Sequence, residues 1–327
     1  MVFTDNLVLA VCIVFGCVIV WFLASFIAFL LVFYSPKRKP LSDDDYPLPT
    51  GKAYEPYYEQ LRQWVQEVRC LEHTDVSIRS HDGLQLRGRY YRFYESAPIE
   101  LMLHGYRGDS VRDLSGGVIR ARRAKHNVLV VDNRASGRSD GHIITFGIKE
   151  CDDCLQWIDF ILKEIDSEAQ IILAGVSMGA STVLLAAGSP LPKNVIGVLA
   201  DCGFTSPEKI IKDVMRKIHV PVTLVYPLIA FGARVFGKLD LHSRTSEKAM
   251  RHATLPILFF HGDADDFVPM QMSVDNYHQC TSRTKRLVII KKAGHGLCFA
   301  ADQTLYLQEM DAFFLTTKKS RIIMKIT

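Results

Sequence analysis

The chain has 327 residues, of which 48% are hydrophobic and 23% are charged, and its formal net charge at pH 7 is +4. This length allows one large α/β core and does not by itself require a second domain. Lysine and arginine are spread along the chain, apart from small clusters at 37–39, 120–125 and 318–319, so nucleic-acid binding is not expected.

The N-terminus is strongly apolar. Residues 6–35 carry no charged side chain, and this uncharged run is long enough to cross a bilayer as a helix. A signal peptide has basic residues before a shorter apolar stretch and a small-residue cleavage site, whereas here Asp5 is the only charged side chain ahead of the run. We therefore predict a single-pass transmembrane anchor over residues 1–35. Because the basic cluster at 37–39 follows the span, the catalytic domain is expected on the cytoplasmic face, with the extracytoplasmic cell surface as the alternative.

The eight cysteines agree with a reducing compartment. Cys12 and Cys17 lie in the predicted span, and the other six lack the regular spacing of a disulfide framework. Cys151 and Cys154 form a Cys-x-x-Cys pair, but they begin an amphipathic helical pattern, enclose two aspartates and have no second pair for zinc. We interpret them as buried helix residues, and we expect neither a metal nor an organic cofactor.

The segments after the anchor predict a linker, a helix and a hairpin. Residues 36–53 are rich in proline and include an acidic run, as in a solvated linker. A short helix is expected over 57–71, and alternating strands at 74–79 and 84–93 flank a turn. The catalytic domain is therefore predicted over 54–327, and its hairpin would form antiparallel edge strands.

The most informative motif is Gly-Val-Ser-Met-Gly at 175–179. It follows an apolar strand at 170–174 and precedes a helix-forming segment at 180–187. Strand, tight turn and helix in this order predict a nucleophile elbow, in which small neighbours let the backbone turn sharply and expose the hydroxyl of Ser177. The alternative is a turn that needs glycine only to pack a helix on a strand.

A candidate acid follows a later buried strand, 255–260. That strand leads into His-Gly-Asp-Ala-Asp-Asp-Phe-Val-Pro, whose spacing His-Gly-x-x-Asp favours Asp265 as the acid. Asp263 and Asp266 are expected to cap the turn and the next helix. Asp201, at the end of the strand 195–201, is the alternative acid.

A candidate base comes next along the chain. The strand 286–290 leads into a loop in which His295 stands between two glycines. A histidine placed after nucleophile and acid is the expected general base, which takes the Ser177 proton while Asp265 fixes the ring tautomer.

Acyl transfer also needs N–H donors for the oxyanion. The usual sources are the residue after the nucleophile, here Met178, and the loop after the third strand. The apolar strand 99–103 leads into His-Gly-Tyr-Arg-Gly at 104–108, where the N–H of Tyr106 is the best candidate.

These motifs resemble the serine hydrolases of the α/β-hydrolase superfamily. The matching patterns are His-Gly-x-x-Gly, Gly-x-Ser-x-Gly, His-Gly-x-x-Asp-x-x-Val-Pro and Gly-His, which together span 99–295. The chain is most similar to bacterial membrane-anchored, cell-surface-type hydrolases, whose substrates are largely unassigned. The segment 128–141 also resembles the family's Asp-x-Arg-Gly-x-Gly-x-Ser loop, with Ala135 where glycine is commoner.

The resemblance implies a mostly parallel sheet flanked by helices, with a helical cap inserted at about 203–254. The centre of that insertion, 220–233, is uncharged and contains two prolines, so it is too short and interrupted to span a bilayer. We interpret it as an apolar lid that lines an acyl pocket or rests on the bilayer, the alternative being a helix buried against the core.

The sequence therefore predicts a membrane-anchored serine hydrolase of esters or thioesters, with a lipid-like or acylated substrate. One alternative is a serine peptidase of the prolyl-oligopeptidase type, although Ala180 replaces a glycine usual there and no propeller domain is present. Another alternative is a binding protein that kept the fold and lost activity, although such proteins usually lack a triad residue.

Overall fold

The computed structural model of the chain describes residues 2–37 and 48–326. Arg38, Lys39 and the acidic run at 43–45, on which the orientation and linker predictions partly depend, lie outside the described residues. The strands are β1 (Thr74–Arg79), β2 (Gln85–Tyr91), β3 (Ile99–Leu103), β4 (Asn127–Asp132), β5 (Ile171–Val176), β6 (Val195–Asp201), β7 (Ile257–Gly262) and β8 (Lys285–Ile290). The helices are α1 (Val2–Phe33), the 3₁₀ turn η1 (Glu55–Tyr57), α2 (Tyr58–Cys70), α3 (Ser110–Arg123), α4 (Ile148–Phe160), the π-helical turn η2 (Ile161–Ile165), α5 (Met178–Ala187), α6 (Pro207–Lys217), α7 (Val222–Phe236), α8 (Ser246–Met250), α9 (Met270–Gln279), α10 (Cys298–Ala301) and α11 (Gln303–Ile326).

Within the described residues, eight strands form one sheet in the order β1-β2-β4-β3-β5-β6-β7-β8. The β1–β2 and β2–β4 pairs are antiparallel, and every other pair is parallel. The predicted hairpin and the mostly parallel sheet are confirmed. Because the parallel strands run in one direction, the loops after β3, β5, β6, β7 and β8 all leave from the same edge.

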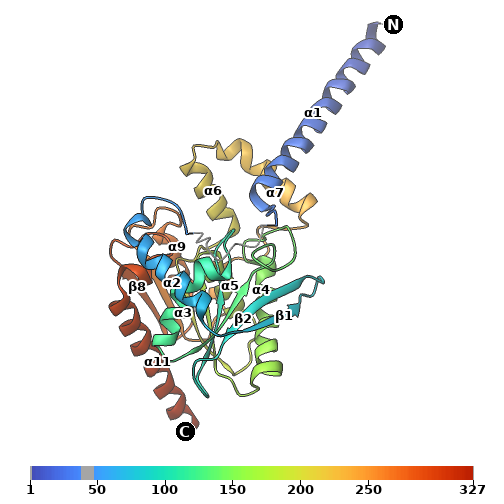
Figure 1. Cartoon of the computed structure of the whole chain (residues 1–327). Coiled ribbons are helices and arrows are strands. Elements are labelled where there is room, and N and C mark those ends of the chain that lie inside the picture. The colour runs from blue at the N-terminus through green and yellow to red at the C-terminus, as the bar shows by residue number, and fades with distance from the viewer. Residues whose placement is uncertain (1, 38–47, 327) are drawn as a thin grey trace.

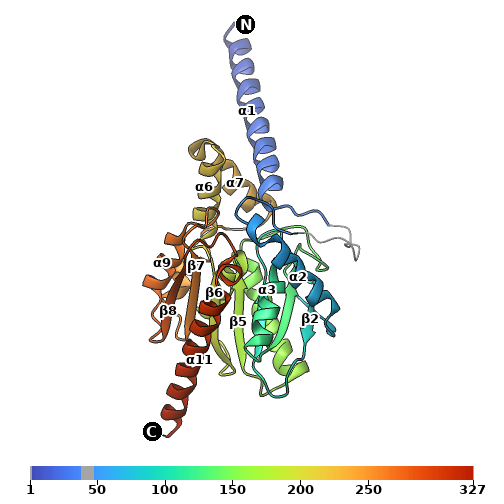
Figure 2. The same cartoon turned by 60° about the vertical axis from the view of Figure 1, so that its left-hand side comes forward.

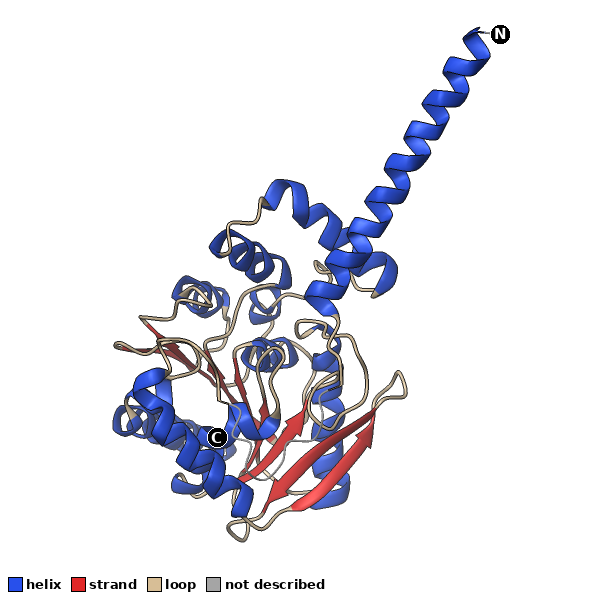
Figure 3. Cartoon of the chain, turned by 45° about the horizontal axis from the view of Figure 1, so that its top comes forward, coloured by secondary structure: helices blue, strands red, loops and turns tan. Residues whose placement is uncertain are grey.

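Two hydrophobic cores cover the two faces of the sheet. Leu101 and Leu103 of β3 enter the core shared with α4 and α5, whereas Met102 between them enters the core shared with α2, α3 and α11. Successive side chains of a strand point to opposite faces, so a strand that is buried on both faces is apolar throughout. Figure 3 shows helices on both sides of the strands.

The C-terminal part of α1, from Phe22 onward, contacts the rest of the domain. Residues 5–23 are exposed along their whole length, whereas Ser25, Phe29 and Phe33 are buried. This end of α1 packs along α7, so closely that a Cβ on Gly232 would lie 2.4 Å from the Ser25 carbonyl oxygen. The rest of α1 extends away from the domain (Figures 1 and 2).

The insertion between β6 and β7 forms three helices with different surroundings. Helices α6 and α7 lie at the end of the domain from which α1 projects (Figure 2), whereas α8 packs against α5. The segment predicted as an apolar lid falls in α7, which continues through Pro227. The packing of α7 against the predicted anchor was not among the sequence predictions.

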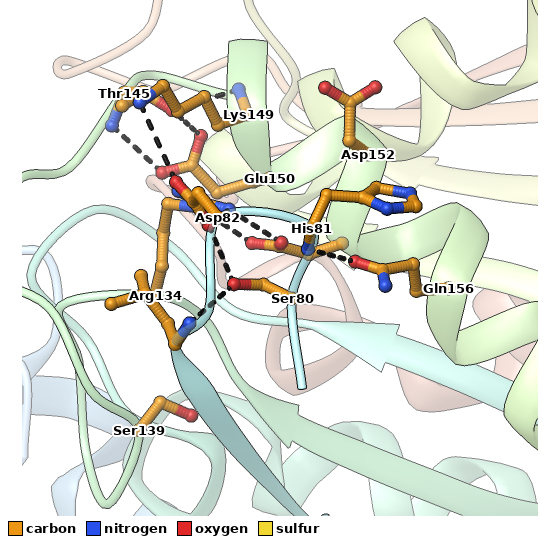
Figure 4. A network of polar contacts seen from close by, with 12 residues as sticks. Ser80, His81, Asp82, Arg134, Ser139, Thr145, Lys149, Glu150, Asp152 and Gln156 are labelled. Carbon is orange, nitrogen blue, oxygen red and sulfur yellow. Dashed lines mark hydrogen bonds and ion pairs between the residues drawn. The ribbon is translucent and has the colours of Figure 1, made fainter. Parts of the chain in front are cut away.

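A buried arginine stabilises the loop after β4. Arg134 donates from Nε and Nη2 to both carboxylate oxygens of Asp153 on α4, at 2.7 and 2.6 Å. It also donates from Nη1 to Asp82 in the β1–β2 turn at 2.8 Å (Figure 4). These bonds join three segments of the chain and hold the loop that carries Asn133, a neighbour of the candidate site. Hydrogen bonds from Arg134 and Ser80 also hold the pKa of Asp82 well below its usual range, although partial burial opposes the shift.

A second buried charge cluster lies between β3 and α3. Glu100 is fully buried, accepts a hydrogen bond from Nη1 of Arg120 at 3.1 Å, and lies 2.8 Å from Nδ1 of His126. Burial opposes ionisation of Glu100, but the guanidinium of Arg120 and the contact with His126 lower its pKa to about 2. The carboxylate is therefore ionised inside the fold at neutral pH.

We expect Glu100→Gln to lower the free energy of unfolding by about 3 kcal/mol at pH 7, because it leaves Arg120 buried without a counter-charge. A depressed carboxyl pKa stabilises the fold above the unfolded-state pKa, and this contribution is lost as the pH falls toward the folded-state pKa. The difference in the free energy of unfolding between wild type and variant should therefore stay constant above about pH 5 and shrink between about pH 4.5 and 2. Urea unfolding of the full chain in detergent, followed by tryptophan fluorescence, measures this difference.

Asp159→Asn is the matched control, because Asp159 pairs with Lys163 on the surface, 3.9 Å away. This substitution should change the free energy of unfolding by no more than about 0.5 kcal/mol at every pH. A Glu100→Gln effect that does not change down to about pH 2 would contradict the pKa assignment.

Candidate active site

Ser177 lies on a strained turn between β5 and α5, with φ of +56° and ψ of −118°. The flanking glycines make this turn possible. A Cβ on Gly175 would lie 2.3 Å from the carbonyl of Gly179, and a Cβ on Gly179 would lie 2.0 Å from the Leu103 carbonyl oxygen. A non-glycine residue in this backbone conformation costs about 1–3 kcal/mol and persists only where its surroundings hold it. The turn has the form of the predicted nucleophile elbow.

The structure brings the three predicted residues Ser177, His295 and Asp265 into one hydrogen-bonded chain. Nε2 of His295 lies 2.9 Å from Oγ of Ser177, and its Nδ1 lies 2.8 Å from Oδ2 of Asp265. The three residues lie 30 to 118 positions apart in sequence and meet because their loops leave the same edge of the sheet. Both distances fall within hydrogen-bonding range.

The carboxylate of Asp265 has several hydrogen-bond donors. Its Oδ1 accepts from the N–H groups of Phe267 and Val268 at 2.9 and 2.8 Å, and its Oδ2 lies 3.2 Å from Nε2 of His261. Burial opposes ionisation, but the hydrogen bonds from His261 and His295 outweigh it and hold the pKa of Asp265 well below its usual range. Asp265 is therefore an anion at neutral pH.

This anion determines the tautomer of His295. A carboxylate can only accept, so Nδ1 of His295 carries the proton that faces Asp265. Nε2 then has a free lone pair, which accepts the hydroxyl proton of Ser177. This is the arrangement a general base needs before it removes that proton.

The alternative acid, Asp201, does not make this bond. Asp201 ends β6, beside Val176, and its backbone carbonyl accepts from the N–H of Ser177 at 2.9 Å. Its side chain is buried, and burial raises its pKa. The ring of His295 is hydrogen-bonded to Asp265, so the geometry favours the acid that the motif spacing had indicated.

The loop 104–108, here called the oxyanion loop, lies beside Ser177. A Cβ on Gly105 would lie 3.5 Å from Cβ of Ser177. His104 is fully buried, accepts from the N–H of Asn133 at 3.0 Å through Nε2, and donates from Nδ1 to the Gly105 carbonyl oxygen at 2.7 Å. His104 therefore holds the base of the loop. Met178 follows Ser177 in the chain and Tyr106 follows Gly105, and the role of their N–H groups in binding an oxyanion stays a prediction.

Sequence reasoning missed two residues that support the site. Tyr54 donates its hydroxyl proton to the His295 carbonyl oxygen at 2.9 Å, across 241 positions of sequence. His261 is fully buried, and its Nδ1 lies 2.7 Å from Oγ of Ser273. His261 belongs to the motif that indicated Asp265, so its support could have been inferred from the sequence. No local pattern marks Tyr54.

Within the described residues, one group of potential metal ligands comes together. Sγ of Cys202 and the ligand atoms of Asp265 and His295 all lie within 4.8 Å of one another. Burial, followed by the charges of Asp201 and Asp265, raises the pKa of the Cys202 thiol well above its usual value. The other two groups, Asp265 and His295, are already hydrogen-bonded to each other, an arrangement that suits proton transfer.

A comparison with known families decides the class of protein. The model of the alpha/beta hydrolase family matches residues 101–305, which include the elbow, the acid motif and the histidine loop. The chain belongs to the alpha/beta hydrolase family. This confirms the superfamily and the fold predicted from the motifs.

Known proteins agree with this membership. The uncharacterized protein YqkD of Bacillus subtilis is 22% identical over 251 residues, which cover 74% of this chain and 79% of that protein. Protein bem46 of Schizosaccharomyces pombe is 24% identical over 250 residues, with 76% and 74% coverage. Among solved structures, the esterase Pf2001 of Pyrococcus furiosus has a TM-score of 0.62 at 19% identity, covering 83% of this chain and 99% of its own. A bacterial membrane phospholipase A has a TM-score of 0.54 at 17% identity, with 81% and 95% coverage. These solved structures share the alpha/beta hydrolase fold.

We expect Tyr54→Phe to lower kcat about three- to tenfold, because it removes one hydrogen bond that holds the His295 loop while leaving the ring in place. KM for a short p-nitrophenyl ester should change less than kcat. Steady-state kinetics of the full chain in detergent measure both values. Tyr58→Phe, one helical turn further on, is the matched control and should behave as wild type; equal kcat values for the two variants would contradict a supporting role of Tyr54.

Proposed function

We propose that this alpha/beta hydrolase is a membrane-anchored serine hydrolase that cleaves carboxylic ester or thioester bonds. Ser177, His295 and Asp265 would form its catalytic triad, with the N–H groups of Met178 and Tyr106 as the oxyanion hole. The observation that carries the proposal is the hydrogen-bonded chain from Asp265 through His295 to Ser177, with distances of 2.8 and 2.9 Å. It joins a buried anion, an imidazole and a hydroxyl on a strained turn.

The reaction follows from this arrangement. Oγ of Ser177 attacks the acyl carbonyl carbon while its proton passes to Nε2 of His295, and Asp265 stabilises the imidazolium that forms. The carbonyl oxygen becomes an oxyanion, which the two N–H groups stabilise. The intermediate then expels the alcohol or thiol, which takes the proton from His295, and leaves an acyl group on Ser177. Water, deprotonated by the same histidine, releases the acid and restores the serine.

The surroundings of the site support a lipid-like or acylated substrate. Residues 5–23 of α1 are exposed and span about 28 Å at 1.5 Å per residue, close to the thickness of the hydrocarbon core of a bilayer. Packing against α7 begins at the end of this stretch, where the ring of Phe22 packs edge-on against Phe236, and continues at Ser25. If α1 spans the membrane, α7 lies at the membrane surface, where Leu224, Phe231 and Val235 expose apolar side chains. Such a cap would receive acyl chains from the bilayer.

Three further observations bear on this proposal. The buried end of α1 favours a retained anchor over a signal peptide cleaved after the apolar run, because that cleavage would remove Phe29 and Phe33 from the core of the cap. We keep the cytoplasmic orientation as part of the proposal, on the basis of the basic cluster at 37–39. Two proteins that share the fold are named as an esterase, Pf2001, and as a membrane phospholipase A, which supports an ester over a peptide substrate in our proposal.

A fluorophosphonate probe should label the full chain in detergent, and Ser177→Ala should abolish the labelling. Asp265→Asn should lower kcat for p-nitrophenyl butyrate by about 10³- to 10⁴-fold, because it removes the anion that selects the tautomer of His295. Asp201→Asn is the matched control for loss of a buried carboxylate at the neighbouring strand end, and it should retain activity within about tenfold. Labelling that survives in Ser177→Ala, or a greater loss in Asp201→Asn than in Asp265→Asn, would contradict the assignment.

The lid proposal predicts a preference for longer acyl chains. For p-nitrophenyl esters from two to twelve carbons, kcat/KM should rise by about tenfold or more, because each buried methylene contributes up to about 0.8 kcal/mol. Leu224→Ser, on the exposed apolar face of α7, should reduce this gain more than Thr223→Ser, which changes an exposed polar residue beside it. An optimum at two carbons would contradict an acyl-binding cap, and faster cleavage of aminoacyl p-nitroanilides would favour the peptidase alternative.

A further inference from the structure

The last turn of α1 is hydrogen-bonded to the oxyanion loop. Nη2 of Arg107 donates to the carbonyl oxygens of Leu31 and Tyr34, at 2.8 and 3.0 Å. The hydroxyl of Tyr106 donates to the carbonyl oxygen of Val32 at 2.6 Å. Two successive residues of the oxyanion loop thus bind the end of the predicted membrane anchor.

These bonds complete the C-terminus of α1. The last four carbonyls of a helix have no partner within the helix, and α1 has no basic residue in its last turn. Arg107 supplies both a donor and a positive charge at this negative end of the helix dipole. Of the other two carbonyls of the turn, that of Leu30 accepts from the N–H of Tyr34 at 3.2 Å and that of Phe33 from the N–H of Ile144 at 2.9 Å. The helix end is therefore satisfied by other parts of the domain.

Ring contacts extend the same connection. The ring of Tyr106 stacks on Phe146, with centroids 5.1 Å apart, and Phe146 packs edge-on against Phe33 of α1 at 5.6 Å. Phe33 is fully buried, in the same apolar cluster as Met178. The end of α1 thus packs into the layer that contains both predicted N–H donors.

The backbone of the oxyanion loop needs such support. Arg107 has a φ of +52°, a left-handed conformation that is unfavourable for a side chain other than glycine. From the side of the sheet, His104 and Asn133 hold the start of the loop at 3.0 Å. On the opposite side, the side chains of Tyr106 and Arg107 hold the loop through their hydrogen bonds to the end of α1.

We propose that the last turn of α1 is a structural part of the active site and that Arg107 and the Tyr106 hydroxyl are positioning residues. They hold the oxyanion loop so that the Tyr106 N–H faces Ser177, and the anchor is then required for turnover as well as for attachment to the membrane. This inference rests on the proposed function, because it assigns a role to residues around the same serine.

The test uses the full chain in detergent and p-nitrophenyl acetate, a water-soluble ester whose cleavage does not need a membrane. Tyr106→Phe removes one oxygen and keeps the ring, and Arg107→Ala removes both bonds to α1. We expect kcat to fall about tenfold in the first variant and about 10- to 100-fold in the second, with KM within about threefold, because loss of a whole oxyanion donor costs about 10²- to 10³-fold. Arg107→Lys, which keeps the charge, should recover part of the loss.

Lys37→Ala is the matched control, because Lys37 lies four positions beyond the end of α1 and pairs with Asp140 on the surface at 3.4 Å. It should keep the wild-type kcat. The specific readout is inhibition by a trifluoromethyl ketone, whose adduct with Ser177 places an oxyanion in the same hole. Its Ki should rise in each variant by about the same factor as kcat/KM falls.

The outcomes separate the two proposals. If the wild-type chain hydrolyses the ester and both variants match Lys37→Ala, the positioning role is wrong and the proposed function stands. An unchanged kcat with a higher KM, or an unchanged Ki for the ketone, also overturns the positioning role. If the wild-type chain neither reacts with a fluorophosphonate nor hydrolyses the ester, both proposals fall. If Arg107→Ala does not fold, Tyr106→Phe alone decides the question.

Discussion

The candidate site depends on the backbone turn at Ser177. The turn places a serine in a left-handed conformation, with φ of +56°, between two glycines whose missing side chains let the start of α5 pass directly behind β3. The N–H of Ser177 is bonded to the carbonyl of Asp201 on the next strand, so the turn is also tied to the sheet. Because β3, β5, β6 and β7 are parallel neighbours or next neighbours, fixing this turn places the loops that follow them within reach of the serine.

Charge is distributed unequally among the buried groups around the serine. Asp265 has two backbone N–H donors and two histidines, and its pKa lies well below the usual range. Asp201 ends the neighbouring strand, and burial raises its pKa. The different hydrogen-bond donors around two similar carboxyls therefore decide which of them is the stable anion beside His295. Burial, together with the charges of Asp201 and Asp265, raises the pKa of the Cys202 thiol well above its usual value.

The two ends of the N-terminal helix α1 lie in different surroundings. Its first part is exposed along residues 5–23, a length that suits a bilayer, and its last turns are buried against α7 and hydrogen-bonded to the loop that carries Tyr106. A flexible tether would only raise the local concentration of enzyme at a membrane. A helix that ends inside the cap also fixes the orientation of the site relative to the helix. In our proposal, this helix connects the membrane to the oxyanion loop.

The sequence by itself determined the succession of strands and helices along the chain and the mostly parallel sheet. It also proposed Ser177, His295 and either Asp265 or Asp201 as site residues. The fold predictions succeeded because they rest on local patterns: apolar runs for strands buried on both faces, and glycines where the backbone leaves no room for a side chain. The antiparallel hairpin of β1 and β2 was predicted for the same reason, since its alternation and its turn are encoded within a few residues.

Only the tertiary structure decided which groups meet across long stretches of chain. The bond from Tyr54 to the His295 carbonyl crosses 241 positions, and the bonds from Tyr106 and Arg107 to α1 cross 73 to 76. In each case one partner is a backbone carbonyl, which every residue has, so no residue type in the sequence marks the contact. The choice between Asp201 and Asp265 likewise required the direction of the His295 ring, which depends on the packing of several loops at once.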